Sequence, residues 1–449
     1  MPVTTIKVDY LVIGAGAMGM AFADTLVAES DYTMAIVDRY DAPGGHWNIS
    51  YPFVRLHGPS SIYGVNSRGM PSDPFAGGLA SRNEILDYYD RVMRETLIGS
   101  GRVTYLPMHN LDGVETGQPP TARAHSLLTG ATVEIVVKRR IVDASYMKIM
   151  VPAMGDPGYI VEDGVALVPV NRLTALGGEP ERFTVLGAGK TGIDACLWLL
   201  GHGVDPGRIT WIAPRDAWLI NREWEQAADV LPLLKLSECR SADGVADTLE
   251  QMGAVMRRAP DVAPSAFRCA TVNPQELSQL RKIEDVVRLG RVRHISTTGV
   301  QLDAGTIASP PGTVYVDCTA DGLTQQPLKP VFDGSAITLQ PLLSCLLPVS
   351  AALAAKLESF DVDDELRNGL CTPVFNPSSS NDLLSFHSIR LDRLIRWSSS
   401  PLLHDWLGTT RLATGLTGLS AIEQIKAPGV QDEAARLASH LDDLVKMAS

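Results

Sequence analysis

Two copies of one glycine pattern, far apart in the chain, restrict its possible folds more than any other feature. The first copy follows a short apolar run at 8–13 and reads Gly14-Ala-Gly16-Ala-Met-Gly19. An apolar stretch typical of a helix comes next, and a second apolar run lies at 34–37. This order predicts a strand, a glycine turn, a helix and a second strand, which together form a dinucleotide-binding unit.

Each glycine of the first copy has its own physical task. Gly14 permits the tight turn, Gly16 lets the backbone approach a pyrophosphate, and Gly19 lets the helix pack closely on the strand. Asp38 follows the glycines by about 20 residues, which is the usual sequence spacing for a carboxylate that binds the ribose hydroxyls. Arg39 is the next residue in the same loop. We predict that these five residues bind the first dinucleotide; the alternative is a plain strand–helix turn that binds nothing.

The second copy of the pattern reads Gly187-Ala-Gly189-Lys-Thr-Gly192 and follows an apolar run at 183–186. An apolar helical stretch comes after it, so it repeats the first architecture and predicts a second dinucleotide site. The letters GAGKTG also resemble the end of a phosphate-binding P-loop. That motif would need glycine at Thr184, so we do not expect an ATPase.

The residue after the next predicted strand distinguishes the two sites. The apolar run at 209–213 ends in Pro214-Arg215, where the first unit has an acid. An arginine suits a 2′-phosphate, whereas an acid suits a ribose diol. We therefore expect NADP(H) in the second site, with Arg215 as the main candidate and Arg222 as a further one. The alternative is that Arg215 is a surface cation in a turn.

Length and charge narrow the class of protein. The 449 residues suit two or three domains, and the net charge of −12 argues against nucleic acid and anionic membranes as partners.

The nine histidines show no metal-ligand spacing, so we expect no catalytic metal. The six cysteines form no CxxC pair and are typical of single thiols in a reducing compartment. With a strand beginning by residue 8, we expect no targeting peptide and a cytoplasmic location.

A segment after Asp38 carries paired glycines and large aromatic residues. It begins with Gly44-Gly45-His46-Trp47, and Tyr51 follows shortly after. Paired glycines let the backbone turn sharply against a flat or charged group. The segment is therefore typical either of a loop that covers a cofactor or, equally, of a packed surface loop.

The same region resembles the class B flavoprotein monooxygenases, which comprise the flavin-containing and the Baeyer–Villiger monooxygenases. Their GGxW segment is matched at 44–47, and their YPGxRxD-like run at 51–57, with Phe for Gly and His for Asp. A PS-x-Y segment at 59–63 and then Asn66 follow in the family's order. The resemblance implies that the first dinucleotide is FAD, that Gly45 and Trp47 belong to its site, and that Asn66 lies near its ring.

The resemblance implies an α/β fold in which an NADP-binding Rossmann domain is inserted into an FAD-binding Rossmann domain. The expected domains are 1–160 for the first part of the FAD domain, 161–312 for the NADP domain with a helical insertion, and 313–449 for the second part of the FAD domain and the C-terminal helices. Residues 275–288 predict one amphipathic helix. The amphipathic helix expected at 432–447 could serve packing or a homodimer contact.

The function that the resemblance implies is an NADPH-dependent monooxygenase. Its reduced flavin would capture dioxygen as a hydroperoxide and oxygenate a small nitrogen, sulfur or ketone substrate, with Asn66 as the catalytic residue. The family's FxGxxxHxxx(Y/F/W) fingerprint is missing, and residues 147–182 contain no histidine. The alternatives are a flavin reductase or dehydrogenase that transfers no oxygen and a non-catalytic NADP(H) sensor. The missing CxxC argues against the disulfide-reductase branch.

Overall fold

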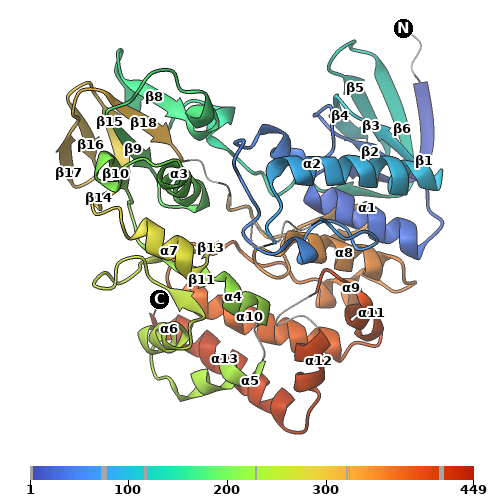
Figure 1. The fold of residues 1–449 in the computed structure, drawn as a ribbon. Coiled ribbons are helices and arrows are strands. Elements are labelled where there is room, and N and C mark those ends of the chain that lie inside the picture. The colour runs from blue at the N-terminus through green and yellow to red at the C-terminus, as the bar shows by residue number, and fades with distance from the viewer. Residues whose placement is uncertain are drawn as a thin grey trace.

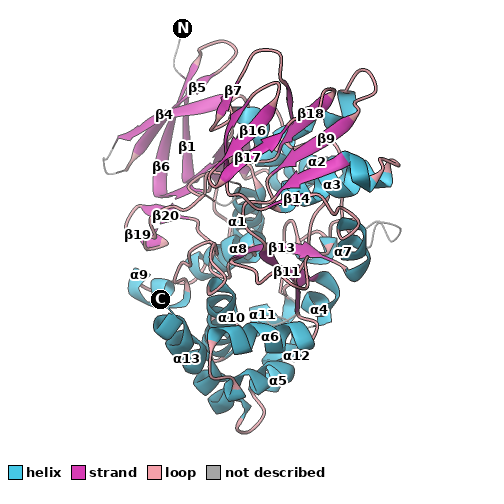
Figure 2. Ribbon diagram, turned by 90° about the vertical axis from the view of Figure 1, so that its left-hand side faces the viewer, coloured by secondary structure: helices cyan, strands magenta, loops and turns pink. Residues whose placement is uncertain are grey.

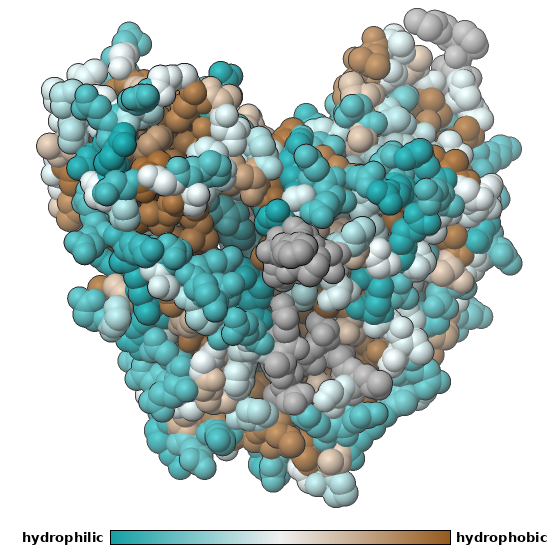
Figure 3. Space-filling view, in the orientation of Figure 1, coloured by the Kyte–Doolittle hydropathy of each residue, from teal (hydrophilic) through white to brown (hydrophobic). Residues whose placement is uncertain are grey.

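The computed structural model describes residues 4–71, 78–115, 119–227, 230–319, 322, 324–413 and 419–448. Two α/β lobes lie side by side at the top of Figure 1, above a mainly helical body. Figure 2 shows the strands of both lobes at the upper end, and Figure 3 shows the surface hollowed between the lobes. Within the described ranges no helix combines the length and the apolar character needed to cross a membrane.

The first lobe is built on a sheet with the strand order β19-β20-β6-β1-β2-β3, and β4 and β5 extend it as a hairpin beside β6. Its strands are β1 (Thr4–Ile13), β2 (Met34–Val37), β3 (Val103–Leu106), β4 (His109–Glu115), β5 (Thr121–Ser126), β6 (Thr132–Asp143), β19 (Phe332–Asp333) and β20 (Ala336–Thr338). Helices α1 (Ala17–Glu29) and α8 (Leu347–Glu358) pack against each other below the sheet (Figure 1). Both are apolar on nearly every side, as expected of helices that are buried all round.

The second lobe repeats this plan between β6 and β19 of the first. Its sheet has the order β14-β10-β9-β18-β8, and a four-stranded sheet of order β17-β16-β15-β7 lies beside it. The elements are β7 (Ile160–Val161), β8 (Ala166–Pro169), β9 (Arg182–Leu186), α3 (Lys190–Gly201), β10 (Ile209–Ile212), β14 (Val286–Val287), β15 (Val292–Ile295), β16 (Gly299–Leu302), β17 (Gly305–Ala308) and β18 (Thr313–Asp317). Strand β18 still belongs to this sheet, and the chain returns to the first lobe after it.

The helix predicted over 275–288 is wrong in its second half. Helix α7 (Pro274–Leu280) begins with a capping box between Asn273 and Glu276, but it ends at Leu280. Residues 286–287 instead form the edge strand β14, which pairs in parallel with β10. The β-branched valines suit a strand, and this pairing with a distant segment outweighs the local helical period.

The lower body combines helices with a small three-stranded sheet. Its helices are α4 (Arg222–Ala227), α5 (Val230–Leu233), α6 (Ala242–Gln251), α10 (Asp382–Ser398), α11 (His404–Thr409), α12 (Leu419–Ile425) and α13 (Val430–Ala448), and its strands are β11 (Ala217–Asn221), β12 (Val255–Met256) and β13 (Ala266–Val272). The apolar face of α13 packs on α10 within the chain, and Leu437 and Leu441 are fully buried. That face therefore serves intramolecular packing.

The cysteines require a correction. The spacing of the six cysteines predicts single thiols, but a disulfide joins Cys269 to Cys345, whose Cα atoms are 6.7 Å apart. The two residues are separated by 76 positions, so no local sequence spacing predicts that they pair. The other four cysteines are free thiols, namely Cys196, Cys239, Cys318 and Cys371.

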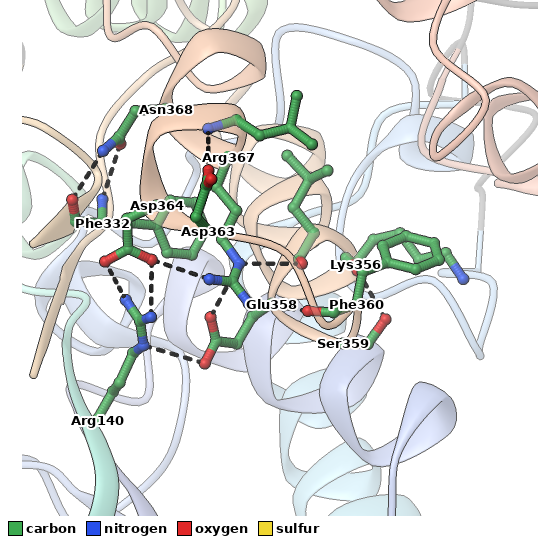
Figure 4. Close-up of polar contacts among 12 residues, drawn as sticks. Arg140, Phe332, Lys356, Glu358, Ser359, Phe360, Asp363, Asp364, Arg367 and Asn368 are labelled. Carbon is green, nitrogen blue, oxygen red and sulfur yellow. Dashed lines mark hydrogen bonds and ion pairs between the residues drawn. The ribbon is translucent and has the colours of Figure 1, made fainter. Parts of the chain in front are cut away.

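A buried ion cluster ties the sheet of the first lobe to α8 and α9 (Asp364–Leu370) (Figure 4). Glu358 at the end of α8 lies 3.2 Å from Nε of Arg140 and 3.5 Å from Nε of Arg367. Asp364 bridges the same two arginines at 2.7 Å and 2.9 Å. Because Glu358 is only 5% exposed, its charge depends on both arginines for compensation.

Candidate functional site

The first glycine turn joins β1 to α1, and its geometry requires glycine at two positions. Gly14 has a φ of +101°, which residues with a side chain rarely adopt, and its N–H donates to the carbonyl of Val37 at 2.8 Å. A Cβ on Gly19 would lie 1.9 Å from the carbonyl oxygen of Gly14. These two glycines therefore hold the helix against the strand.

The helices after both turns begin without a capping side chain. Gly16 precedes α1 and Gly189 precedes α3; neither helix has a side-chain cap or an acidic residue in its first turn. The first backbone amides of each helix are therefore open to an anion, which the helix dipole also favours. A Cβ on Gly189 would meet no protein atom within 4 Å. The residues at both turns thus fit the pyrophosphate of a dinucleotide.

Asp38 lies at the carboxyl end of β2, next to the first turn. Its carboxylate accepts hydrogen bonds from the backbone N–H of Ala15 at 2.5 Å and of Tyr40 at 2.8 Å. Burial raises the pKa of Asp38, while these bonds and the charge of Arg39 oppose the rise. Arg39 itself is exposed and lies over the ring of Tyr40. Since a carboxylate has about four acceptor positions, Asp38 retains capacity for ribose hydroxyls.

The paired-glycine loop packs directly on this turn. The N–H of Gly44 donates to the carbonyl of Ala15 at 2.8 Å, and a Cβ on Gly45 would lie 2.9 Å from the Cα of Gly16. Trp47 is 6% exposed, and its indole N–H donates to the hydroxyl of Tyr63 at 2.8 Å. The loop is thus a packed element that borders the proposed dinucleotide path.

Asn66 follows a loop that two distant residues hold in place. The guanidinium of Arg411 donates to the carbonyls of Ser61, Tyr63 and Val65 at 2.5, 2.6 and 2.8 Å. On the other side of Asn66, the buried Asp24 of α1 accepts a hydrogen bond from the N–H of Ser67 at 2.9 Å. Asn66 therefore occupies a constrained position beside α1.

The second glycine turn repeats the geometry of the first. Gly187 has a φ of +107°, and a Cβ on it would lie 2.8 Å from the carbonyl oxygen of Cys318. A Cβ on Gly192 would lie 2.0 Å from the carbonyl oxygen of Gly187. Gly187, Gly189 and Gly192 thus correspond in position to the three glycines of the first turn.

Arg215 is exposed just beyond β10, near two other arginines. Burial and the nearby charges of Arg268 and Arg291 lower the pKa of Arg215. This concentration of positive charge suits a phosphate. Arg222 is different, because it is 6% exposed and its guanidinium lies 3.0 Å from the carboxylate of Glu276. Arg222 therefore makes contacts within the fold, whereas Arg215 remains the candidate for a charged ligand.

A cavity of about 210 Å³ lies between the first lobe, α3 and the three-stranded sheet of the lower body. Tyr51 of the first lobe donates to the carboxylate of Asp194 on α3 at 2.7 Å, and Asp194 also pairs with Lys190. These contacts join the two lobes at the cavity. Its lining residues are Phe53, Arg55, Leu56, Leu79, Lys190, Ile193, Asp194, Leu197, Trp198, Arg222, Thr271, Val272 and Glu276.

Known proteins similar to this chain include two from mycobacteria. No protein-family model matches the chain. It is 42% identical over 467 aligned residues to uncharacterized protein Rv2000 of Mycobacterium tuberculosis (strain ATCC 25618 / H37Rv) and to uncharacterized protein Mb2023 of Mycobacterium bovis (strain ATCC BAA-935 / AF2122/97). Each alignment covers 99% of this chain and 85% of the relative. The chain belongs to the family of these mycobacterial proteins.

Solved structures identify the fold of this family member. The closed crystal structure of cyclohexanone monooxygenase has a TM-score of 0.51 and 13% identity, covering 98% of this chain and 98% of that chain. An oxidized steroid monooxygenase bound to NADP has a TM-score of 0.51 and 13% identity, covering 99% of this chain and 98% of that chain. The expected α/β fold, with one Rossmann unit inserted into another, is confirmed.

Residues from distant segments, which no sequence motif indicates, also contribute to both candidate sites. Arg411, together with Thr410, holds Asn66, and Arg268 and Arg291 lie near Arg215. None belongs to a motif, and only folding brings them close. The glycines of each turn, with Asp38 after the first, lie within short units of the sequence, so the sequence alone could indicate them as candidates.

Proposed function

We propose that this chain is a cytoplasmic FAD- and NADPH-dependent monooxygenase. Its substrate would be a small molecule with a nitrogen, a sulfur or a ketone group, and its second substrate dioxygen. One observation carries the proposal: two dinucleotide turns share one fold, with a buried acid at the end of β2 and an arginine group at the end of β10. An acid fits the ribose of FAD, and arginines fit the 2′-phosphate of NADPH.

The protein residues would bind and orient the two cofactors. Asp38 would accept hydrogen bonds from the adenosine ribose, and the first amides of α1 would hold the pyrophosphate. Arg215 would hold the 2′-phosphate of NADPH. FAD, when bound, supplies the redox chemistry and the reaction with oxygen described in the sequence analysis.

Asn66 would act as a donor beside the flavin. Its side-chain oxygen is already an acceptor for residues 410 and 411, so its amide nitrogen is the group oriented for a ligand. The packed loop at 44–47 and the loop clamped by Arg411 would exclude water from this side. Exclusion of water prevents the decay of reactive oxygen adducts.

A stopped-flow experiment tests the proposal. The purified protein with FAD is reduced by NADPH without oxygen and is then mixed with aerated buffer, while the flavin absorbance is followed. A delay with a distinct absorbing species before reoxidation is expected of a monooxygenase. Immediate reoxidation would contradict oxygen transfer and support a reductase or dehydrogenase, and tight cofactor binding without reduction would support a sensor. A protein that binds no flavin would overturn the assignment as a whole.

A further inference from the structure

The Cys269–Cys345 disulfide occupies a position that the proposed function does not use. Cys345 lies in the segment between the end of β20 at Thr338 and the start of α8 at Leu347. The strand registers align Ile13 with Asp143, and Asp143 with Thr338, so β1, β6 and β20 end side by side. The segment that carries Cys345 therefore begins at the edge where the first glycine turn lies.

The path of the first dinucleotide leads toward this segment. Its adenosine half would lie at Asp38, at the end of β2, and its pyrophosphate at the glycine turn after β1. The sheet order β2-β1-β6-β20 leaves the ends of β6 and β20 for the other half. Since neighbouring strands lie about 5 Å apart, β20 is about 10 Å beyond β1. The flavin end would thus approach residues 339–346.

Cys269 connects the same place to the cavity between the lobes. It lies on β13, whose residues Thr271 and Val272 line the cavity. The ring of His57, in the loop of the first lobe, hydrogen-bonds to the backbone of Cys269. The disulfide therefore lies between the expected flavin end and the cavity.

The backbone at both ends of the disulfide is unusual. Among the described residues, three other than glycine have a positive φ: Met108, Cys269 at 54° and Ser344 at 48°. Cys269 is a member of the disulfide, and Ser344 is the direct neighbour of Cys345. Such conformations persist where the surrounding structure imposes them, and they concentrate at functional sites.

We propose that Cys269 and Cys345 form a redox-active pair that accepts two electrons from the reduced flavin. This inference rests on the FAD part of the proposed function. A hydride equivalent from the anionic reduced flavin would break the S–S bond and give oxidised flavin, one thiol and one thiolate. A proton from water would convert the thiolate to the second thiol. A second NADPH would then reduce the oxidised flavin again, and the loaded protein would store four electrons, two on the flavin and two on the cysteines.

The exposure of the cysteines makes the pair measurable. Cys345 is partly exposed, whereas Cys269 is 5% exposed. Cys239 is a partly exposed free thiol outside this site and serves as an internal reference for labelling. A thiol-specific alkylating agent should therefore mark Cys345 once the disulfide is open.

The experiment uses the FAD-loaded full chain without oxygen. NADPH is titrated until the flavin is fully bleached, and the protein is then alkylated and its cysteine peptides are measured by mass spectrometry. We expect bleaching to need about twice as much NADPH per flavin in the wild type as in Cys345→Ser, since the pair takes up two electrons. Alkylation of Cys345 should rise strongly with NADPH, while that of Cys239 stays constant. The control variant Cys239→Ser should titrate like the wild type.

The outcomes separate this inference from the proposed function. Equal NADPH consumption in the wild type and Cys345→Ser, with no new alkylation, would overturn the redox-active pair while leaving the flavoprotein assignment intact. A protein that binds no FAD would overturn both. If Cys345→Ser fails to fold, labelling of the wild type with and without NADPH decides alone, because an unchanged alkylation of Cys345 contradicts the proposal.

Discussion

The hydroxyl of Thr410 donates a hydrogen bond of 2.7 Å to the side-chain oxygen of Asn66, which lies 344 residues earlier in the chain. The backbone N–H of Arg411 donates to the same oxygen at 3.2 Å. Two donors on one oxygen determine which end of the amide is the oxygen. The C-terminal part of the chain therefore orients the residue that the sequence analysis places beside the flavin.

Asn66→Ala should uncouple NADPH oxidation from oxygenation. The variant should still bind FAD and be reduced by NADPH, because the glycine turns and Asp38 are unchanged. Without the amide donor, the oxygen adduct should decay to hydrogen peroxide, so peroxide formed per NADPH consumed should increase several-fold. Asn83→Ala, at an exposed asparagine on α2 (Arg82–Arg91), is the matched control. Unchanged peroxide release in Asn66→Ala would remove Asn66 from the mechanism.

The buried ion cluster should make a large contribution to stability. Glu358→Gln would remove one of the two carboxylates of this cluster that pair with Arg140 and Arg367, and the more deeply buried of the two (Figure 4). Breaking a buried pair in this way costs about 3 kcal/mol, whereas an exposed pair contributes about 1 kcal/mol or less. The control is Glu29→Gln, which breaks the pair between Glu29 of α1 and Lys356, a residue of the same helix as Glu358. Equal shifts of the urea midpoint in the two variants would contradict the role of Glu358.

Asp364 should contribute to acid denaturation. Burial raises the pKa of Asp364, but the hydrogen bonds and charges of Arg140 and Arg367 outweigh it and hold the pKa below its usual range. Stability from this carboxylate is therefore present above the unfolded value of about 4 and is lost as the pH falls through the lower folded value. Asp364→Asn should lower the urea midpoint near neutral pH and flatten its acid dependence. Asp163→Asn, at an exposed position, should follow the wild type; an identical acid slope in Asp364→Asn would contradict the assignment.

The sequence predicted those parts of the fold and the candidate sites that depend on local geometry. Gly14 and Gly187 adopt positive φ values, and Gly19 and Gly192 permit close helix packing. A few adjacent residues therefore determine each turn. The second Rossmann unit followed from finding the turn twice, whereas its insertion into the first was implied by the family resemblance.

Features that depend on distant contacts escaped the sequence analysis. The helical period over 275–288 continues past Leu280, but pairing with β10 makes 286–287 a strand. The Cys269–Cys345 pair and the bond from Thr410 to Asn66 likewise join segments whose proximity only the fold creates. No spacing rule covers such contacts.

Two glycines of the second turn should separate folding from cofactor binding. A Cβ on Gly192 would lie 2.0 Å from the carbonyl oxygen of Gly187, so Gly192→Ala should lower stability by about 3 kcal/mol even without ligand. A Cβ on Gly189 meets no protein atom within 4 Å, so Gly189→Ala should melt like the wild type. It should nevertheless weaken NADPH binding, because the pyrophosphate would need that space. Melting curves and NADPH titrations of both variants test this, and unchanged NADPH affinity in Gly189→Ala would place the nucleotide elsewhere.

Arg215 should determine the preference for NADPH over NADH. Its neighbours Arg268 and Arg291 make its charged form less favourable, and a 2′-phosphate would relieve that repulsion. Arg215→Ala should weaken NADPH binding about 10- to 100-fold, the range for a hydrogen bond to a charged group, and leave NADH binding nearly unchanged. Arg293→Ala removes an exposed arginine paired with Asp303 and serves as the control. Binding of both nucleotides is measured by titration at fixed ionic strength. An equal loss for NADH would mean that Arg215 supports the fold of the site and does not recognise the phosphate.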